Sequence, residues 1–157
     1  MVPKFRGKRK DNGEWVVGVP IPNSFYNVVH MIPILLTDKV AYPPERLHEY
    51  LIEIVPETLG QSTGLKDKND VEIFEGDVLL HTSSSVNYSD TYWHSYVQVY
   101  RIDSGAYRIK GKHIYDTELM SARNRLEVVG NIYQNQNLLD KEYFSTSDGI
   151  VEQANEK

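Results

Sequence analysis

Short strand-like runs, each closed by a turn signal, recur along almost the whole chain. The clearest signal is the pair Asn12-Gly13, which stands between two such runs and suits the positive φ angles of a type I′ hairpin turn. After this pair, alternate residues from Trp15 to Ile21 fall on one face, as in a half-buried strand. No segment alternates strands with long helices, so the pattern predicts an antiparallel, mainly β fold.

The rest of the chain fits the same scheme. We expect strands over residues 28–36, 51–55, 78–81, 96–102, 106–109 and 126–133. Helical turns are expected over 45–50, and a short helix within 135–144, near the C-terminus. We expect turns over 60–64, 67–70 and 103–105, and a long loop over 82–95, because these segments are rich in Gly, Asn, Asp and Ser.

Two larger expectations concern the organisation of the chain. The strand that follows Gly76 and the hairpin of residues 96–109 have the order of strands and turns found in a small SH3-like, partly open barrel. Residues 1–139 are expected to form a single β-rich domain. Residues 140–157 are expected to form a polar, acidic tail that frays from Ser145 onward.

Composition narrows the class of protein. A chain of 157 residues with 40% hydrophobic and 25% charged residues has the size and make-up of one soluble globular domain. It contains no cysteine, which excludes a disulfide framework and a thiolate metal site. No apolar run reaches membrane-spanning length and the start shows no secretory signal, so we expect a cytoplasmic protein without a membrane partner.

The stretch GQSTG at residues 60–64 spells the G-x-S-x-G pattern of the nucleophile elbow of serine hydrolases. An elbow needs a helix after its second glycine, but residues 66–70 are turn-like and lack a helical apolar stripe. We therefore interpret GQSTG as a turn whose glycines supply backbone freedom, and Ser62 as a structural residue rather than a nucleophile.

Other patterns that carry chemistry are weak. One group of side chains suggests a calcium loop: Asp67, Asn69, Glu72, Glu75 and Asp77. The positions at which an EF-hand has its glycine and its last glutamate hold other residues here, so a solvated turn is favoured. The five histidines lack zinc-binding spacing, and no phosphate-binding glycine loop occurs. We predict no catalytic residue, no metal and no cofactor, and hence a protein that is not an enzyme.

Three stretches carry longer motifs. Residues 5–16 read FRGKRKDNGEWV, residues 56–78 contain TGLKDKN and IFEGDV, and residues 127–139 contain EVVGNIY followed by a pair of leucines. In sequence, order and spacing these stretches resemble the YopX family, whose members are encoded by phages and prophages. The resemblance implies a β-rich fold, a phage or prophage origin in a bacterial host and a tendency to self-associate. It implies no activity, because the family has none that is established.

The chain departs from the pattern of that family at two positions. Ser62 stands where the family has an aromatic residue, so the hydrolase-like spelling is particular to this chain. Asp70 stands where a glycine is common. The turn after Asn69 must therefore adopt a different conformation or accept backbone strain.

The charges are spread unevenly along the chain. The net charge is -5, yet every charged side chain among the first ten residues is basic, and acids dominate from Asp140 onward. The overall charge argues against bulk attraction to nucleic acid or anionic lipid. The first functional hypothesis is therefore a non-enzymatic accessory protein of a phage or prophage, which self-associates and works through protein contacts.

The alternative is a small nucleic-acid-binding β-barrel. Its basic N-terminal hairpin would contact phosphate, and exposed aromatic side chains would stack on unpaired bases. The residues that would make these contacts are Lys4, Arg6, Lys8, Arg9, Lys10, Tyr92 and Trp93. Tyr96 and Tyr100 are candidates for stacking too, but we interpret them as residues of one strand face that pack on the sheet.

Overall fold

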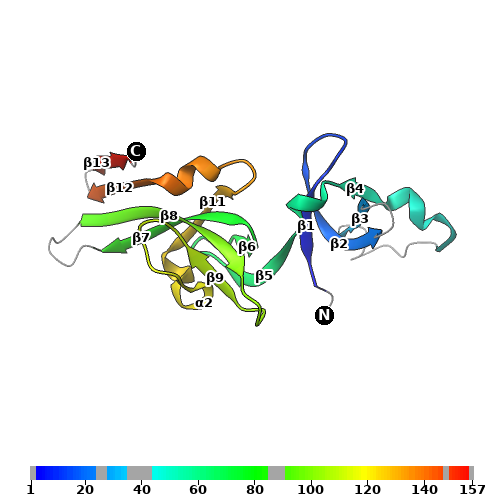
Figure 1. The fold of residues 1–157 in the computed structure, drawn as a ribbon, viewed down its shortest axis with the longest axis horizontal. Helices are drawn as coiled ribbons and strands as arrows, with labels where there is room; N and C mark the ends of the chain where they lie inside the picture. The colour runs from blue at the N-terminus through cyan, green and yellow to red at the C-terminus, as the bar shows by residue number, and fades with distance from the viewer. Residues whose placement is uncertain (1–2, 24–27, 35–43, 85–90, 147–148, 156–157) are drawn as a thin grey trace. The chain divides into compact units, whose positions relative to one another are not determined.

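The computed structural model describes residues 3–23, 28–34, 44–84, 91–146 and 149–155 (Figure 1). Contacts divide the chain into two compact units, Met1–Ser62 and Thr63–Lys157. This division falls inside the range 1–139 for which the sequence predicts one domain. The described strands pair in antiparallel fashion throughout, so the predicted mainly β fold is confirmed.

Neither sheet closes into a barrel within the described residues, and the SH3-like barrel stays a prediction. Over the same residues, no helix is long and apolar enough to cross a membrane.

The first unit is built on a sheet whose strands from the first to the fourth each pair with the next one in sequence, whereas the fifth returns to pair with the first. The full sheet order is β4-β3-β2-β1-β5-β6, in which β6 (Glu72–Phe74) belongs to the second unit. The elements of the first unit are β1 (Phe5–Lys8), β2 (Trp15–Asn23), β3 (Val28–Pro33), the 3-10 helix η1 (Pro44–Tyr50), β4 (Ile52–Ile54), the 3-10 helix η2 (Pro56–Thr58) and the start of β5 (Gly60–Lys66). The segment around β4 also bonds to the end of β1, since the Val55 N–H donates to the Lys8 carbonyl oxygen over 2.8 Å. Met31 and Ile54 are fully buried in this unit.

The first hairpin forms as predicted, but its turn is not type I′. Among the four loop residues only Gly13 has a positive φ (75°), whereas a type I′ turn needs two. The Gly13 N–H donates to the Arg9 carbonyl oxygen (3.1 Å), and the Arg9 N–H to that of Glu14 (2.7 Å). The Asn12 side chain accepts from the Glu14 N–H (2.9 Å), so Asn12 acts through a local side-chain bond instead of a left-handed backbone.

The GQSTG stretch is strand, and its interpretation as a turn is wrong. It lies in β5, where the Ser62 N–H donates to the Lys4 carbonyl oxygen over 2.8 Å. Gly64 has a φ of 75°, so the freedom predicted for glycine is used within a strand. The chain continues as strand to Lys66, and Ser62 does not occupy the strand-to-helix turn of a nucleophile elbow.

The second unit is organised around one long strand, β8 (Thr91–Arg101). On one side β8 pairs with β7 (Asp77–Ser84). On the other side its first half pairs with β12 (Lys141–Thr146) and its second half with β9 (Tyr107–Lys110). The remaining elements are β6 (Glu72–Phe74), β10 (Thr117–Glu118), α2 (Leu119–Ala122), the 3-10 helix η3 (Arg123–Arg125), β11 (Leu126–Asn131), the 3-10 helix η4 (Gln136–Asp140) and β13 (Gly149–Asn155).

The core of this unit follows from strand alternation. Val97 and Val99 of β8 point to the buried face, while Tyr96, Gln98 and Tyr100 lie on the other face. The expectation that the two tyrosines share a strand face is therefore confirmed. The buried cluster consists of Ile73, Leu79, Val97, Val99, Ile109, Leu119, Ala122 and Leu126.

Two predictions for the second unit are wrong in part, and one is confirmed. The loop expected over 82–95 is strand at both ends, and residues 85–90 lie outside the described residues. The short helix expected within 135–144 is present as the 3-10 helix η4, and β12 follows it from Lys141. The tail expected to fray pairs instead, since β12 lies between β8 and β13 (orange to red in Figure 1). Polar residues form strands here because neighbouring strands satisfy their backbone groups.

Candidate functional site

The TGLKDKN motif builds a turn around one buried carboxylate. Asp67 is 5% exposed. Its Oδ1 accepts from the N–H groups of Asn69 (2.8 Å) and Val71 (2.9 Å), and its Oδ2 accepts from the N–H of Val128 (2.8 Å). Asp67 therefore joins the turn of residues 67–70, which is confirmed, to β11. Asp70 has a φ of 67°, so the strain expected where the family favours glycine is present.

The IFEGDV motif uses its aspartate in a similar way. Asp77 is fully buried, and its Oδ2 accepts from the Phe74 N–H over 2.8 Å. The Gly76 N–H donates to the Val99 carbonyl oxygen (3.0 Å), and the Gly76 carbonyl oxygen accepts from Ile132 (2.9 Å). This motif ties the turn before β7 to β8 and to the segment after β11.

In the EVVGNIY motif, amide side chains bond to the main chain of the turn that follows β11. Asn131 Oδ1 accepts from the N–H groups of Tyr133 (3.0 Å) and Gln134 (3.1 Å). The Asn135 side chain folds over Gly130, where an added Cβ would lie 2.2 Å from its Oδ1. The polar groups of these motifs thus serve turns of the fold. Among the described residues no three His, Asp or Glu side chains gather where a metal ion would sit.

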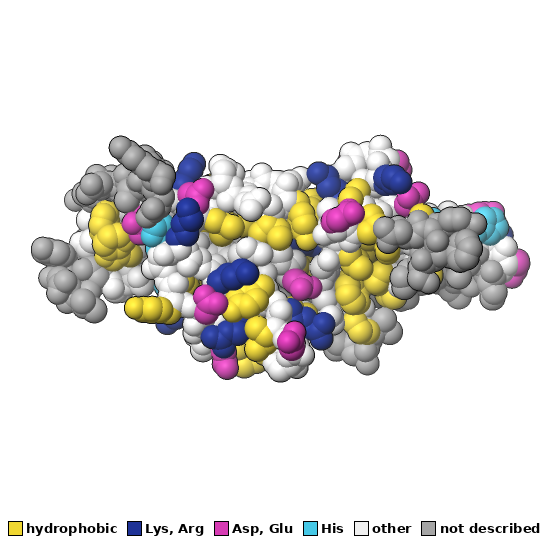
Figure 2. Space-filling view, in the orientation of Figure 1, with side chains coloured by type: hydrophobic (Ala, Val, Ile, Leu, Met, Phe, Trp, Pro, Cys, Tyr) yellow, Lys and Arg dark blue, Asp and Glu magenta, His cyan; other side chains and the backbone are white. Residues whose placement is uncertain are grey.

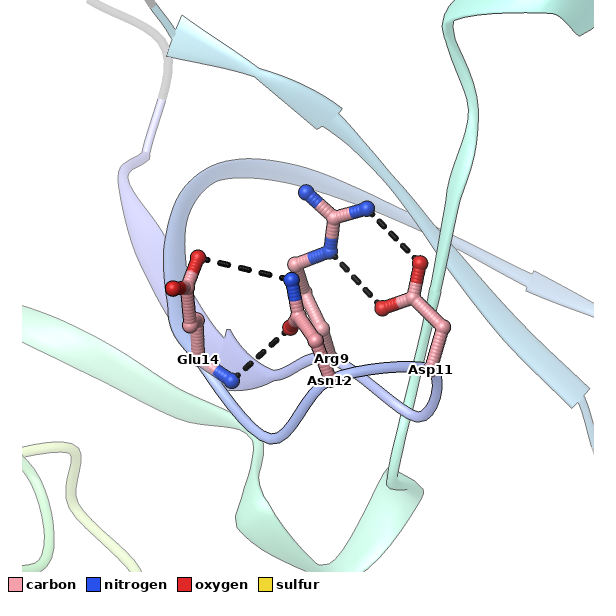
Figure 3. Close-up of polar contacts among 4 residues, drawn as sticks. All are labelled: Arg9, Asp11, Asn12 and Glu14. Carbon is pink, nitrogen blue, oxygen red and sulfur yellow. Dashed lines mark hydrogen bonds and ion pairs between the residues drawn. The ribbon is translucent and has the colours of Figure 1, made fainter.

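Two cations at the turn of the basic N-terminal hairpin are paired with acids. The Arg9 guanidinium donates to both carboxylate oxygens of Asp11, at 3.0 and 2.8 Å (Figure 3). This bidentate contact raises the pKa of Arg9 and lowers the pKa of Asp11. Lys10 Nζ lies 3.0 Å from Glu53 Oε2. The two cations at the turn therefore already have anionic partners.

The other residues of the nucleic-acid hypothesis are divided between the units. Lys4, Arg6 and Lys8 lie in the first unit with Arg9 and Lys10, and the Arg6 guanidinium lies 5.0 Å from the centre of the Trp15 ring. Tyr92 and Trp93 lie on β8 of the second unit, each 38% exposed.

Trp93 packs on Phe144, with ring centroids 3.6 Å apart. On the face drawn in Figure 2, Lys and Arg side chains (dark blue) alternate with Asp and Glu (magenta) instead of forming one basic field.

A split along one side of β8 is the most distinctive feature of the second unit. The pairing of β12 reaches as far as Glu142 opposite Ser95, and the pairing of β9 starts at Lys110 opposite Gln98. Between the two, side-chain pairs connect the segment after β9 with the end of η4 and the start of β12. Lys112 is paired with Asp140, and the Nδ1 of His113 lies 3.3 Å from Glu142 Oε2.

One pocket lies on the core-facing side of this split. Its volume is about 340 Å³, and it is lined by Ser83, Trp93, Ser95, His113, Ile114 and Glu142. Serine, histidine and glutamate are the residue types of a nucleophile and its base. However, Ser95 is only 7% exposed, and none of the hydrogen bonds found over the described residues joins its hydroxyl to His113.

A larger groove lies on the other side of the split, on the face of β8 that carries Gln98. Its volume is about 650 Å³, within the usual range of ligand sites. Amide and charged side chains dominate its lining, among them Gln98, Lys110, Asp116, Gln136, Asn137 and Asp140. Sequence reasoning missed this groove. The only local signal is the polar Gln98 in an otherwise apolar and aromatic run, and nothing marks Gln136 or Asn137.

Comparisons with known proteins agree with this architecture. The crystal structure of protein EF1440 from Enterococcus faecalis is similar, with a TM-score of 0.54 and 27% sequence identity, over 88% of this chain and 99% of that one. No curated protein matches the chain. The model of the family described as YopX protein matches residues 4–140, which include all three motif-bearing stretches. The chain therefore belongs to the YopX family.

Proposed function

We propose that the protein is a non-enzymatic protein-interaction module, encoded by a phage or prophage, that works as a homo-oligomer in the cytoplasm of the bacterial host. One observation carries the proposal. The polar side chains of the family motifs, above all Asp67, Asp77 and Asn131, accept hydrogen bonds from main-chain N–H groups of their own unit. These bonds support a structural role for the motifs, in which their polar side chains hold a scaffold together.

Self-association has support in the edge of the second sheet. β13 pairs with β12 on one side, and no described strand pairs with its other side. An unpaired strand edge is a template for a strand from another chain. A second copy of this chain presents an edge of the same kind, which suits a symmetric contact.

Nucleic-acid binding by an SH3-like barrel is not favoured. Arg9 and Lys10 already have acidic partners, and the net charge of the chain is negative. Releasing those partners to engage phosphate would oppose binding.

Sedimentation velocity of the purified chain tests the proposal. We expect a mass above that of the monomer, and a shift toward the monomer when the chain is shortened after Thr146, which removes β13. A monomer at the highest attainable concentration would contradict self-association. Circular dichroism of the shortened chain shows whether the remaining strands stay folded.

Fluorescence anisotropy tests the nucleic-acid alternative. Labelled duplex DNA and single-stranded RNA are titrated at about 50 and about 200 mM salt, between which phosphate contacts weaken steeply. We expect no salt-sensitive binding. Binding that is lost when Lys8, Arg9 and Lys10 are neutralised would rank the nucleic-acid function above protein interaction.

A further inference from the structure

The groove beside Gln98 is lined by amide side chains that form no hydrogen bond with the described residues of the protein. Gln98 comes from β8, and Gln136 and Asn137 come from η4. None of their side-chain amides takes part in a hydrogen bond with the described residues, and Gln136 and Asn137 are exposed. Two separate elements therefore present solvent-facing donor and acceptor groups, without partners among the described residues, to one groove.

A carboxamide matches the polar groups of a peptide main chain. Its NH₂ donates to a carbonyl oxygen while its own oxygen accepts from an N–H, so one amide can bind one peptide group through two hydrogen bonds. Sugars and nucleic-acid bases offer similar donors and acceptors. The surroundings of the three amides decide among these ligands.

One aromatic ring that contacts groove residues, that of Tyr100, is already covered. Lys110 Nζ lies over the Tyr100 ring, 4.6 Å from its centre. The Tyr100 hydroxyl donates to Asp116 Oδ2 over 2.8 Å. A sugar or a base that stacks on aromatic faces would first have to displace the lysine, so these ligands are disfavoured.

The charges of the groove are balanced. Lys112 is paired with Asp140, and Asp116 accepts from Tyr100 beside Lys110. With two lysines and two aspartates, the groove offers a phosphate no net attraction, and the balance favours a ligand that carries dipoles instead of net charge. Leu139 adds an apolar contact to the same groove.

We propose that this groove binds an extended polypeptide segment of a partner protein, and that Gln98, Gln136 and Asn137 hold the main chain of that segment. The inference rests on the proposed function, since it names the kind of partner and the surface that receives it. Recognition of the main chain tolerates many sequences, and Lys110, Asp116 and Leu139 select among side chains.

The test starts from a library of random dodecapeptides displayed on phage and selected on the immobilised full-length protein. The selected peptide is made synthetically with a fluorophore, and its Kd is measured by anisotropy. In the double variant Gln98→Leu and Asn137→Ala we expect at least about tenfold weaker binding, because two bidentate contacts are lost. The matched control changes Gln61→Leu, in a strand of the first unit, and Asn124→Ala, an exposed asparagine in η3, and should bind like the original chain.

A second arm asks whether the main chain is what is bound. The peptide is resynthesised with single N-methyl groups, which remove one N–H at a time and leave every side chain in place. We expect at least one N-methyl position to weaken binding about tenfold. The proposal is overturned if no peptide is selected, if the groove variant binds as tightly as its control, or if every N-methyl peptide binds like its parent.

Sedimentation of the same double variant separates this proposal from self-association. We expect its mass to equal that of the original chain. A loss of the oligomer in this variant would overturn the proposal, because the groove would then hold a segment of a second copy. A monomeric original chain that still binds the peptide through the groove would instead remove self-association and leave the groove proposal standing.

Discussion

Both units place charged side chains at a turn, but the surroundings of these charges are opposite. In the first unit the turn is flanked by the pairs Arg9–Asp11 and Lys10–Glu53, in which Asp11 is 64% and Lys10 66% exposed. In the second unit the turn is built on Asp67, which is 5% exposed and accepts three main-chain N–H groups.

The comparison shows how solvent sets the value of a charge. Water screens the exposed pairs and hydrates either partner when the other is removed, so such pairs contribute little to stability. Water cannot replace the carboxylate of Asp67 without opening the turn and β11. An aspartate therefore contributes little to the stability of the first unit and much to that of the second.

The largest effect is expected when the buried carboxylate is removed. Asp67→Ala leaves three N–H groups without their acceptor, and we expect the free energy of unfolding to fall by about 3 kcal/mol or more. Urea unfolding followed by circular dichroism measures the change. Asp103→Ala, at an exposed turn of the same unit, is the control. Equal stabilities for the two variants would contradict the claim that burial makes the Asp67 carboxylate important for stability.

A smaller effect is expected from acid pH, through two histidines of the second unit. Burial, with a lesser contribution from Arg125, lowers the pKa of His81, and burial followed by Lys68 lowers the pKa of His94. In the unfolded chain both return to the ordinary value of about 6.5. The unfolded state thus takes up protons first, and stability falls as the pH drops through about 6.5.

Thermal melts between about pH 7.5 and about pH 5.5, a window around the ordinary histidine pKa, measure this loss. We expect the drop in Tm to be smaller in His81→Gln than in the original chain. His48→Gln changes an exposed histidine of the first unit and should leave the drop unaltered. An identical pH dependence in all three proteins would show that His81 is not responsible.

Because the backbone is strained at Asp70, a substitution at this position can raise the free energy of unfolding. Asp70→Gly relieves a left-handed backbone and should raise the free energy of unfolding by about 0.5–1 kcal/mol, although glycine gains freedom in the unfolded chain. Asp70→Ala keeps the strain and should be less stable than either. Urea unfolding of the three proteins gives the order, and a glycine variant below the alanine variant would contradict it.

The smallest effect is expected at the exposed pair of the first unit. Asp11→Ala removes the partner of Arg9, and we expect urea unfolding to show no change beyond experimental error, at low or high salt. Asp103→Ala again serves as the reference. A loss approaching that of Asp67→Ala would mean that exposure does not distinguish the two turns.

Local chemistry made much of the fold predictable. The turn at residues 67–70, the strain at Asp70 and the hairpin around Asn12-Gly13 follow from residue types that favour or resist particular backbone angles. The strands after Asp140 were missed because their polar residues gain partners only when β8 lies beside them. GQSTG was misread for the same reason, since its pairing with β1 is not visible from residues 60–64 alone.

The candidate groove depends even more on tertiary structure. Gln98 meets Gln136 and Asn137 only because β12, directly after η4, pairs with the first half of β8. No spacing in the sequence encodes that approach. The basic residues of the first hairpin were found as a cluster, but the pairing of Lys10 with Glu53 depends on the approach of β4 to the end of β1.

The bond between Asp67 and Val128 also bears on how the chain folds during synthesis. Its two residues are separated by 61 positions, so this carboxylate stays hydrated on the ribosome until β11 has left the exit tunnel. The bond between the Lys8 N–H and Thr58 Oγ1 needs only the first 58 residues. We therefore expect the first unit to fold early in translation, while the second must wait for nearly the whole family segment.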